Sequence, residues 1–172
     1  IYGLALEKSP KTPNLILKLS DILSYTLYES DTERIALRKE LDLIENIIDL
    51  EKERFGRRLN IEFKVEGNPD LIKIPPLILV PFVENAFKHG IKNEVNKGWI
   101  RILVKASEKE LYFAVENSVP TAEKQQTEGG LGLKNIARRL ELIYGENQKL
   151  YIERRNDSFL VNLSIEPDSD EI

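Results

Sequence analysis

PPLILVPFVENAFKHG, at residues 75–90, predicts the helix around which the rest of the chain is arranged. Proline is well tolerated at a helix start, where its missing N–H would have no partner, and glycine is favoured at a helix end. The pair of prolines at 75–76 and the final Gly90 therefore mark the two ends of the expected helix. Five apolar residues recur at helical spacing and predict one buried face: Leu79, Phe82, Val83, Ala86 and Phe87.

A second face of the same helix is polar. Asn85, Lys88 and His89 lie three and four residues apart, so their side chains project in one direction. A buried helix that presents a carboxamide, an ammonium and an imidazole together is arranged like a polar site. From the helix alone, a core helix with a solvated edge explains the pattern equally well.

The composition narrows the classes of function. The 172 residues are enough for one core with an appendage, and a net charge of −4 provides no basic footprint for nucleic acid. The absence of Cys excludes disulfides and thiolate metal sites, and a single His argues against a His-rich metal site. No apolar run is long enough to span a bilayer, and no signal peptide is visible. Because the chain starts at Ile1 and contains no Met, we expect it to be a piece of a longer protein.

Two amphipathic helices are expected before the organising helix. Thr12 and Pro13 have the pattern of an N-cap followed by proline, and the first helix is expected from about 13 to 29. The second is expected from about 37 to 55, with its solvated side formed by Glu40, Asp42, Glu45, Glu51, Lys52 and Glu53. The pair predicts an antiparallel hairpin whose wide apolar surface is covered either by a second hairpin in a dimer or by the rest of its own chain.

From residue 59 onward the pattern changes to alternation, which predicts strands around 61–65, 100–104 and 111–115 and a closing hairpin at 150–165. The polar, aperiodic stretch 118–128 is typical of a functional loop such as a lid. The order of elements predicts an α+β fold: a two-layer α/β sandwich whose mixed, mostly antiparallel sheet carries helices on one face, preceded by the helical hairpin. The expected boundary near Arg57 divides the chain into residues 1–57 and 58–172.

A glycine-rich stretch, GGLGL at residues 129–133, opens a further helix that is expected to end at Gly145. Glycines let a backbone approach a ligand closely, and a helix N-terminus offers N–H groups and a positive dipole end to phosphate. No Gly-Lys-Ser/Thr follows, so this is not a Walker P-loop, and the G-x-G-x-x-G dinucleotide fingerprint is absent. Taken alone, the stretch is a weak signal.

The two stretches together carry a specific resemblance. VENAFKHG at 83–90 and GLGLKNIARRL at 130–140 closely resemble the N box and the G2 box of the ATP-binding domain of sensor histidine kinases. The resemblance is sharpest to the LytS-type family of bacterial two-component kinases, and residues 37–59 resemble the second helix of that family. It implies a Bergerat-type (GHKL) ATPase fold, with 58–172 as the ATP-binding catalytic domain and 1–57 as part of the dimerisation and phosphoacceptor hairpin.

The resemblance also implies ATP and Mg²⁺ as cofactors. Asn85 would coordinate the Mg²⁺ that bridges the ATP phosphates, and Lys88 and His89 would face those phosphates. Glu84 would either aid proton transfer or pair with a cation. The remaining nucleotide-binding positions would be Asn117, Gly130, Gly132, Leu133, Lys134 and Asn135.

The sequence departs from the family pattern at the end of the third expected strand. Asn117 stands where many related kinases have an Asp that accepts a hydrogen bond from the adenine amino group, and Val119 stands where they have a Gly. The carbonyl oxygen of Asn117 can still accept that bond, but it carries no charge. Glu128 stands where a Gly is common at the start of the G2 motif.

The implied activity is transfer of the ATP γ-phosphoryl group to a histidine and then to an aspartate of a response regulator of the LytTR type. The family's acceptor lies on the first hairpin helix, whereas His89 lies on the nucleotide helix, so we expect this piece to lack the acceptor and not to autophosphorylate. The parent would be an inner-membrane sensor with this part in the cytoplasm, a homodimer through the hairpin, with no nucleic-acid partner. The alternative is a non-catalytic dimerisation or docking scaffold of the same fold with a degenerate nucleotide site.

Overall fold

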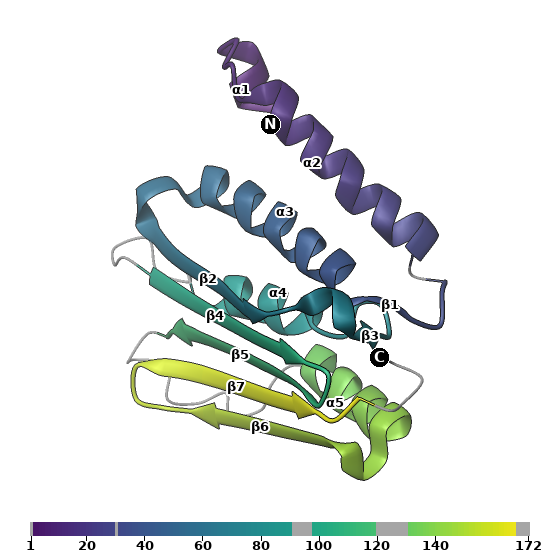
Figure 1. The fold of residues 1–172 in the computed structure, drawn as a ribbon. Coiled ribbons are helices and arrows are strands. Elements are labelled where there is room, and N and C mark those ends of the chain that lie inside the picture. The colour runs from purple at the N-terminus through teal and green to yellow at the C-terminus, as the bar shows by residue number, and fades with distance from the viewer. Residues whose placement is uncertain (1, 30, 91–97, 120–130, 168–172) are drawn as a thin grey trace.

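The computed structural model describes residues 2–29, 31–90, 98–119 and 131–167 (Figure 1). Its centre is a five-stranded sheet of order β2-β4-β5-β7-β6. Only the β2–β4 pair within this sheet is parallel, and the other three pairs are antiparallel. The strand bounds are β2 Leu59–Gly67, β4 Gly98–Ser107, β5 Glu110–Ser118, β6 Gln148–Arg154 and β7 Ser158–Ile165. The predicted mixed, mostly antiparallel sheet is confirmed.

Helices cover one face of this sheet. Figure 1 shows α4 (Val80–Gly90) and α5 (Leu131–Tyr144) lying behind the strands and running in opposite directions. The helix α3 (Leu37–Phe55) lies beside them, and α2 (Thr12–Ser24) runs antiparallel to α3 on the side away from the sheet. A π-helical turn, Tyr25–Glu29, continues α2. The predicted α+β layers and the helical hairpin are therefore both present.

One buried core joins the sheet and three of the helices. Alternate residues of β4 and β5 point toward the helices, as period-two alternation requires. The ring of Phe82 on α4 lies 6.1 Å from that of Phe113 on β5, at a tilted interplanar angle of 41°. The apolar stripe of α3 belongs to the same core: Leu37, Leu41, Ile44 and Ile48. The helix α3 thus packs both on α2 and on the layer that contains α4.

Three short elements were not predicted. The strands β1 (Ile35–Ala36) and β3 (Lys73–Ile74) pair antiparallel, and α1 (Tyr2–Leu6) precedes α2. Two-residue strands are too short for alternation to reveal them. Their pairing, together with a 2.8 Å bond from the Leu37 N–H to the Ile72 carbonyl, attaches the start of α3 to the segment that leads into α4.

One predicted helix start and one predicted N-cap were wrong. The helix α4 begins at Val80, and residues 75–79 precede it as turn and bend, with Leu77 at a φ of 57°. A positive φ at a branched side chain interrupts a right-handed helix, so Pro81 rather than the earlier prolines occupies the first turn. The helix α2 begins at Thr12 itself, and its N-cap is Lys11, which makes no side-chain capping bond.

The expected solvated side of α3 was wrong at one position. Asp42, Glu45 and Lys52 are exposed, and Glu51 and Glu53 are half-buried, but Glu40 is fully buried. The helical spacing explains this burial, because Glu40 lies three residues after one member of the apolar stripe and four before another. Among the described residues, no helix has the length and hydropathy needed to cross a membrane.

Candidate functional site

The helix α4 separates an apolar from a polar side, as the sequence predicted. Its five predicted core positions are all buried: Leu79, Phe82, Val83, Ala86 and Phe87. On the other side, Glu84 and Lys88 are exposed, and Asn85 and His89 are half-buried. Lys88 and His89 fall in the last turn, where the helix dipole favours cations. The polar residues of this helix therefore reach the surface while its apolar side anchors it to β4 and β5.

The strand β5 brings Asn117 to the same face of the sheet. Asn117 follows Phe113 and Val115 at period two, so its side chain shares their face, which is the face that the helices cover. It is only 1% exposed, and its Nδ2 donates to the backbone carbonyl of Ser118 at 2.9 Å. Val119 is also buried, and its N–H donates to the carbonyl of Asp157 at 2.9 Å.

The start of α5 offers exposed polar groups beside open space. Gly132, Lys134 and Asn135 are exposed, and a Cβ built on Gly132 would meet no heavy atom within 4 Å. Leu133 is 3% exposed, so its side chain belongs to the core and only its backbone is left to meet a ligand. Gly130 lies outside the described residues, as does most of the loop that was predicted to be a lid.

The structure brings α4 and α5 into direct contact. Arg139, which the sequence reading did not single out, donates from Nη1 to the backbone carbonyl of Leu77 at 3.3 Å. Leu77 lies three residues before α4 begins. Because the two helices run in opposite directions, this bond near the start of α4 leaves the start of α5 beside the later turns of α4. The helix α4 thus contacts both α5 and β5, the elements that carry the other predicted site residues.

The beginning of α4 is capped from another helix, which local sequence could not reveal. The Oε1 atom of Glu40 on α3 accepts the N–H groups of Leu79 at 2.6 Å and Val80 at 3.2 Å. Its Oε2 accepts the hydroxyl of Tyr25, the first residue of the π-helical turn after α2, at 3.3 Å. The first N–H groups of a helix have no partner within the helix. The Glu40 carboxyl supplies the hydrogen-bond acceptor that the apolar side chains of residues 77–79 cannot provide. The signal available in the sequence was the helical spacing, because Glu40 lies three residues after Leu37 and four before Ile44 of the apolar stripe of α3.

Burial has a consequence for the protonation of this carboxyl. Loss of water around Glu40 raises its pKa to about 7, although the backbone N–H groups and the Tyr25 hydroxyl favour the charged form and act in the opposite direction. Burial, followed by the nearby Glu40 charge, raises the pKa of Tyr25 above its usual range. Tyr25 therefore stays a neutral hydrogen-bond donor to Glu40 throughout the physiological range.

The donor set at α4 suits a metal ion that arrives already bound to phosphates. Among the described residues, no group of three or more His, Asp or Glu side chains could hold a metal by itself. Mg²⁺ keeps several waters and is often bound through one or two protein oxygens together with substrate phosphates. The half-buried carboxamide of Asn85 can supply one such oxygen, and Lys88 next to it can balance phosphate charge. The residues present therefore fit a magnesium–nucleotide complex.

Comparison with known proteins agrees with the resemblance in sequence. The family model described as histidine kinase matches residues 1–59. Sensor histidine kinase YpdA of Escherichia coli (strain K12) is 33% identical over 149 residues, which cover 81% of this chain and 26% of YpdA. Sensor protein LytS of Staphylococcus haemolyticus is 29% identical over 165 residues, which cover 89% of this chain and 28% of LytS. The chain thus spans less than a third of the length of either relative.

A solved structure supports the fold. The histidine kinase ThkA, crystallised in complex with the response regulator protein TrrA, aligns over 97% of this chain and 53% of that chain, with a TM-score of 0.55 and 16% identity. At that identity the likeness concerns the fold alone. Both the hairpin and the sheet with its helices fall within the aligned part, because so little of this chain is left out.

Proposed function

Because this chain belongs to the LytS-type sensor histidine kinases of bacterial two-component systems, we propose that it binds ATP with Mg²⁺ and forms the kinase portion of such a sensor. The observation that supports the proposal best is the polar side of α4, which faces outward beside the open start of α5. A site made of one carboxamide, nearby cations and a helix N-terminus is suited to a polyphosphate.

We assign the roles as follows. Asn85 supplies an oxygen to Mg²⁺, which when bound neutralises charge on the phosphates. Lys88 and His89 face the phosphates from the same side of α4. The start of α5 contributes the exposed polar groups and backbone of Gly132, Leu133, Lys134 and Asn135. The role of Gly130, which lies outside the described residues, rests on the resemblance in sequence alone. Glu84, exposed next to Asn85, aids proton transfer or pairs with a cation.

The base of the nucleotide would lie toward the end of β5. There Asn117 takes the place of the family's adenine-binding acid, and its carbonyl oxygen can accept one hydrogen bond. Its amide already donates to the Ser118 carbonyl, which orients the side chain without a charged partner. We therefore expect adenine to be selected by a neutral acceptor.

The reaction of the whole sensor is transfer of the γ-phosphoryl group to a histidine and then to an aspartate of a response regulator. Positioning and electrostatics supply most of the catalysis in such transfers. His89 is the only histidine of the chain and belongs to the proposed nucleotide helix, so we do not expect it to be the acceptor. We expect this chain to bind nucleotide without autophosphorylating.

The partners follow from the same family. ThkA was crystallised with a response regulator, and we propose a regulator of the LytTR type here. We also propose that residues 1–57 dimerise, since Leu23 and Leu27 of the hairpin are 54% and 67% exposed. In the parent, 58–172 would be the catalytic unit on the cytoplasmic side of a membrane sensor.

One observation favours the alternative of a non-catalytic scaffold. Asn117 is buried and already hydrogen-bonded, and Val119 is buried where the family has glycine. A site that had lost adenine binding would show such features. The alternative predicts a folded chain that does not respond to nucleotide.

Calorimetric titration with ATP and Mg²⁺ separates the two functions. We expect the wild-type chain to bind ATP only when Mg²⁺ is present, and Asn85→Ala to abolish that binding while circular dichroism remains unchanged. Glu45→Ala on the exposed side of α3 is the control. No heat at millimolar ATP from a folded wild-type chain would refute the nucleotide site and favour the scaffold.

A further inference from the structure

One buried carboxyl joins three segments that are far apart in the sequence. Glu40 belongs to α3, Tyr25 to the π-helical turn after α2, and Leu79 and Val80 to the start of α4. Oε1 of Glu40 accepts two backbone N–H groups at 2.6 and 3.2 Å, and Oε2 accepts the Tyr25 hydroxyl at 3.3 Å. Glu40 has no exposed surface, so these bonds take the place of water.

The start of α4 depends on this acceptor. Helix starts are usually capped by a local Ser, Thr, Asp or Asn, but the residues before Val80 are Leu77, Ile78 and Leu79. None of these side chains can accept a hydrogen bond. An unpaired buried N–H is costly. Glu40 supplies the missing acceptor from a helix 39 residues earlier.

We infer that Glu40 is a positioning residue for nucleotide binding: it fixes the start of α4 and thereby the orientation of the Asn85 side of that helix. The inference rests on the function proposed above. Asn85 lies five residues after Val80, or about 8 Å along the helix axis at 1.5 Å per residue. A shift or fraying of the first turn would therefore be transmitted to the carboxamide within the same rigid element.

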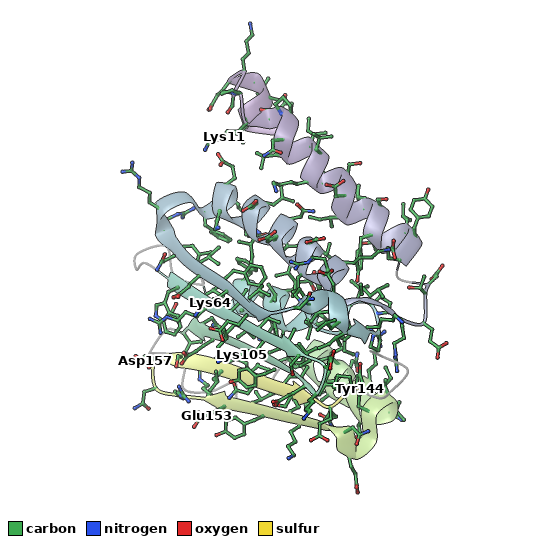
Figure 2. All side chains as sticks on the ribbon, in the orientation of Figure 1. Lys11, Lys64, Lys105, Tyr144, Glu153 and Asp157 are labelled. Atoms are coloured by element: carbon green, nitrogen blue, oxygen red, sulfur yellow. The ribbon has the colours of Figure 1, made fainter. Side chains whose placement is uncertain are left out.

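The second oxygen of Glu40 connects this point to the hairpin. Tyr25 is buried and donates to Glu40 at the place where α2 ends. Elsewhere, α2 and α3 are joined at their surface by polar contacts, including Lys18 with Asp49 at 2.9 Å and Lys11, labelled in Figure 2, with Glu53 at 2.9 Å. Surface ion pairs of this kind contribute little to stability. A displacement of the end of α2 would therefore shift the Glu40 carboxyl through its bond to Tyr25, and with it the start of α4.

The experiment compares substitutions at position 40 that change the hydrogen-bond acceptor and the length of the side chain separately. Glu40→Gln keeps one acceptor oxygen at the same length, Glu40→Met keeps the length but accepts nothing, and Glu40→Asp keeps the carboxylate one methylene shorter. Glu45→Met, on the exposed side of the same helix, is the matched control. Each chain is titrated with Mg²⁺–ATP well below its unfolding temperature, and amide hydrogen exchange is followed at Leu79 and Val80.

We expect Glu40→Met and Glu40→Asp to weaken Mg²⁺–ATP binding about tenfold or more, because a first turn of α4 that has lost a hydrogen bond of about that worth must be ordered again when the nucleotide binds. Exchange at Leu79 and Val80 should accelerate in the same two variants. Glu40→Gln should bind within about threefold of wild type, as the retained oxygen can still accept both N–H groups.

The inference is overturned if the wild type binds Mg²⁺–ATP and Glu40→Asp, as a folded chain, binds it equally well. The Glu40→Asp variant tests the inference even if Glu40→Met does not fold. Faster exchange at Leu79 and Val80 with unchanged affinity would leave Glu40 as a helix cap that does not position the site, which also overturns it. Failure of the wild type itself to bind ATP is a different result, because it refutes the proposed function.

Discussion

Arg139 of α5 donates from Nη1 to the backbone carbonyl of Leu77 at 3.3 Å, and this bond holds the second helix of the candidate site to the segment that leads into the first. Leu77 has a positive φ of 57°, a conformation that a branched side chain adopts only when its surroundings maintain it. The hydrogen bond between Arg139 and Leu77 therefore supports both helices, and neither residue belongs to the polar groups proposed to meet the nucleotide.

Removal of this support should lower the stability of the fold. We expect Arg139→Leu to reduce the free energy of unfolding by about 1 kcal/mol or more, because a charged donor to a carbonyl is lost. Urea denaturation measures the change. The neighbouring Arg138→Leu is the control, since Arg138 is exposed and should alter stability by less than about 0.5 kcal/mol. Equal effects of the two substitutions would contradict the role given to Arg139.

The contact between Phe82 and Phe113 should be one of the strongest attachments of α4 to the sheet. Both side chains are at most 1% exposed, so Phe82→Ala would leave a cavity and is expected to cost about 3–5 kcal/mol. Leu142→Ala, at a site 77% exposed, should change stability by no more than about 0.5 kcal/mol. Guanidinium denaturation of the two variants makes the comparison, and a small loss at Phe82 would contradict the packing described.

The buried Glu40 should make stability depend on pH in a definite direction. Its pKa is about 7 in the folded chain, against an ordinary value of 4.5, so the folded state holds this proton more tightly than the unfolded state does. The contribution is complete below about pH 4.5 and is lost as the pH rises through about 7, with a total on the order of 3 kcal/mol. Other groups also titrate, so the wild type must be compared with Glu40→Gln.

We therefore expect the free energy of unfolding of the wild type to fall, relative to that of Glu40→Gln, between about pH 4.5 and pH 7. Urea denaturation at several pH values gives both curves. Parallel curves across this range would show that Glu40 does not titrate as its burial requires.

Asn117→Asp tests how the chain accommodates its departure from the family pattern. An ionised Asp cannot donate to the Ser118 carbonyl as the Asn117 amide does, and it would be buried, so we expect a loss of about 1–3 kcal/mol at neutral pH. Asn162→Asp is the control, because Asn162 accepts from the Tyr112 hydroxyl through Oδ1 and an Asp can do the same. A neutral or stabilising effect at position 117, measured by urea denaturation, would go against this account of the Asn117 side chain.

Most of the fold could be predicted from periodicity. Alternation placed the strands, and the helical spacing of Leu79, Phe82 and Ala86 correctly identified the buried side of α4. These patterns are visible because burial repeats at the period of the local structure. The polar side of the same helix was visible for the same reason.

Long-range contacts account for what the sequence did not reveal. The start of α4 was placed too early because proline is a local signal, whereas the cap at Val80 comes from Glu40 on another helix. Glu40 was assigned to the solvated side because acids are rarely buried without partners. Its partners are two backbone N–H groups and a tyrosine, and neither their position nor the Arg139 bond to Leu77 follows from spacing along the chain.

The measurement that tests the central claim most directly is a ¹⁵N–¹H NMR titration of the wild-type chain with Mg²⁺ and a non-hydrolysable ATP analogue. The account predicts that the largest shifts fall together on Asn85, Lys88 and His89 of α4 and on Gly132 at the start of α5, and that they disappear when Mg²⁺ is chelated. Shifts confined to other parts of the fold, or none at millimolar analogue in a well-dispersed spectrum, would contradict the assignment of this surface to nucleotide binding.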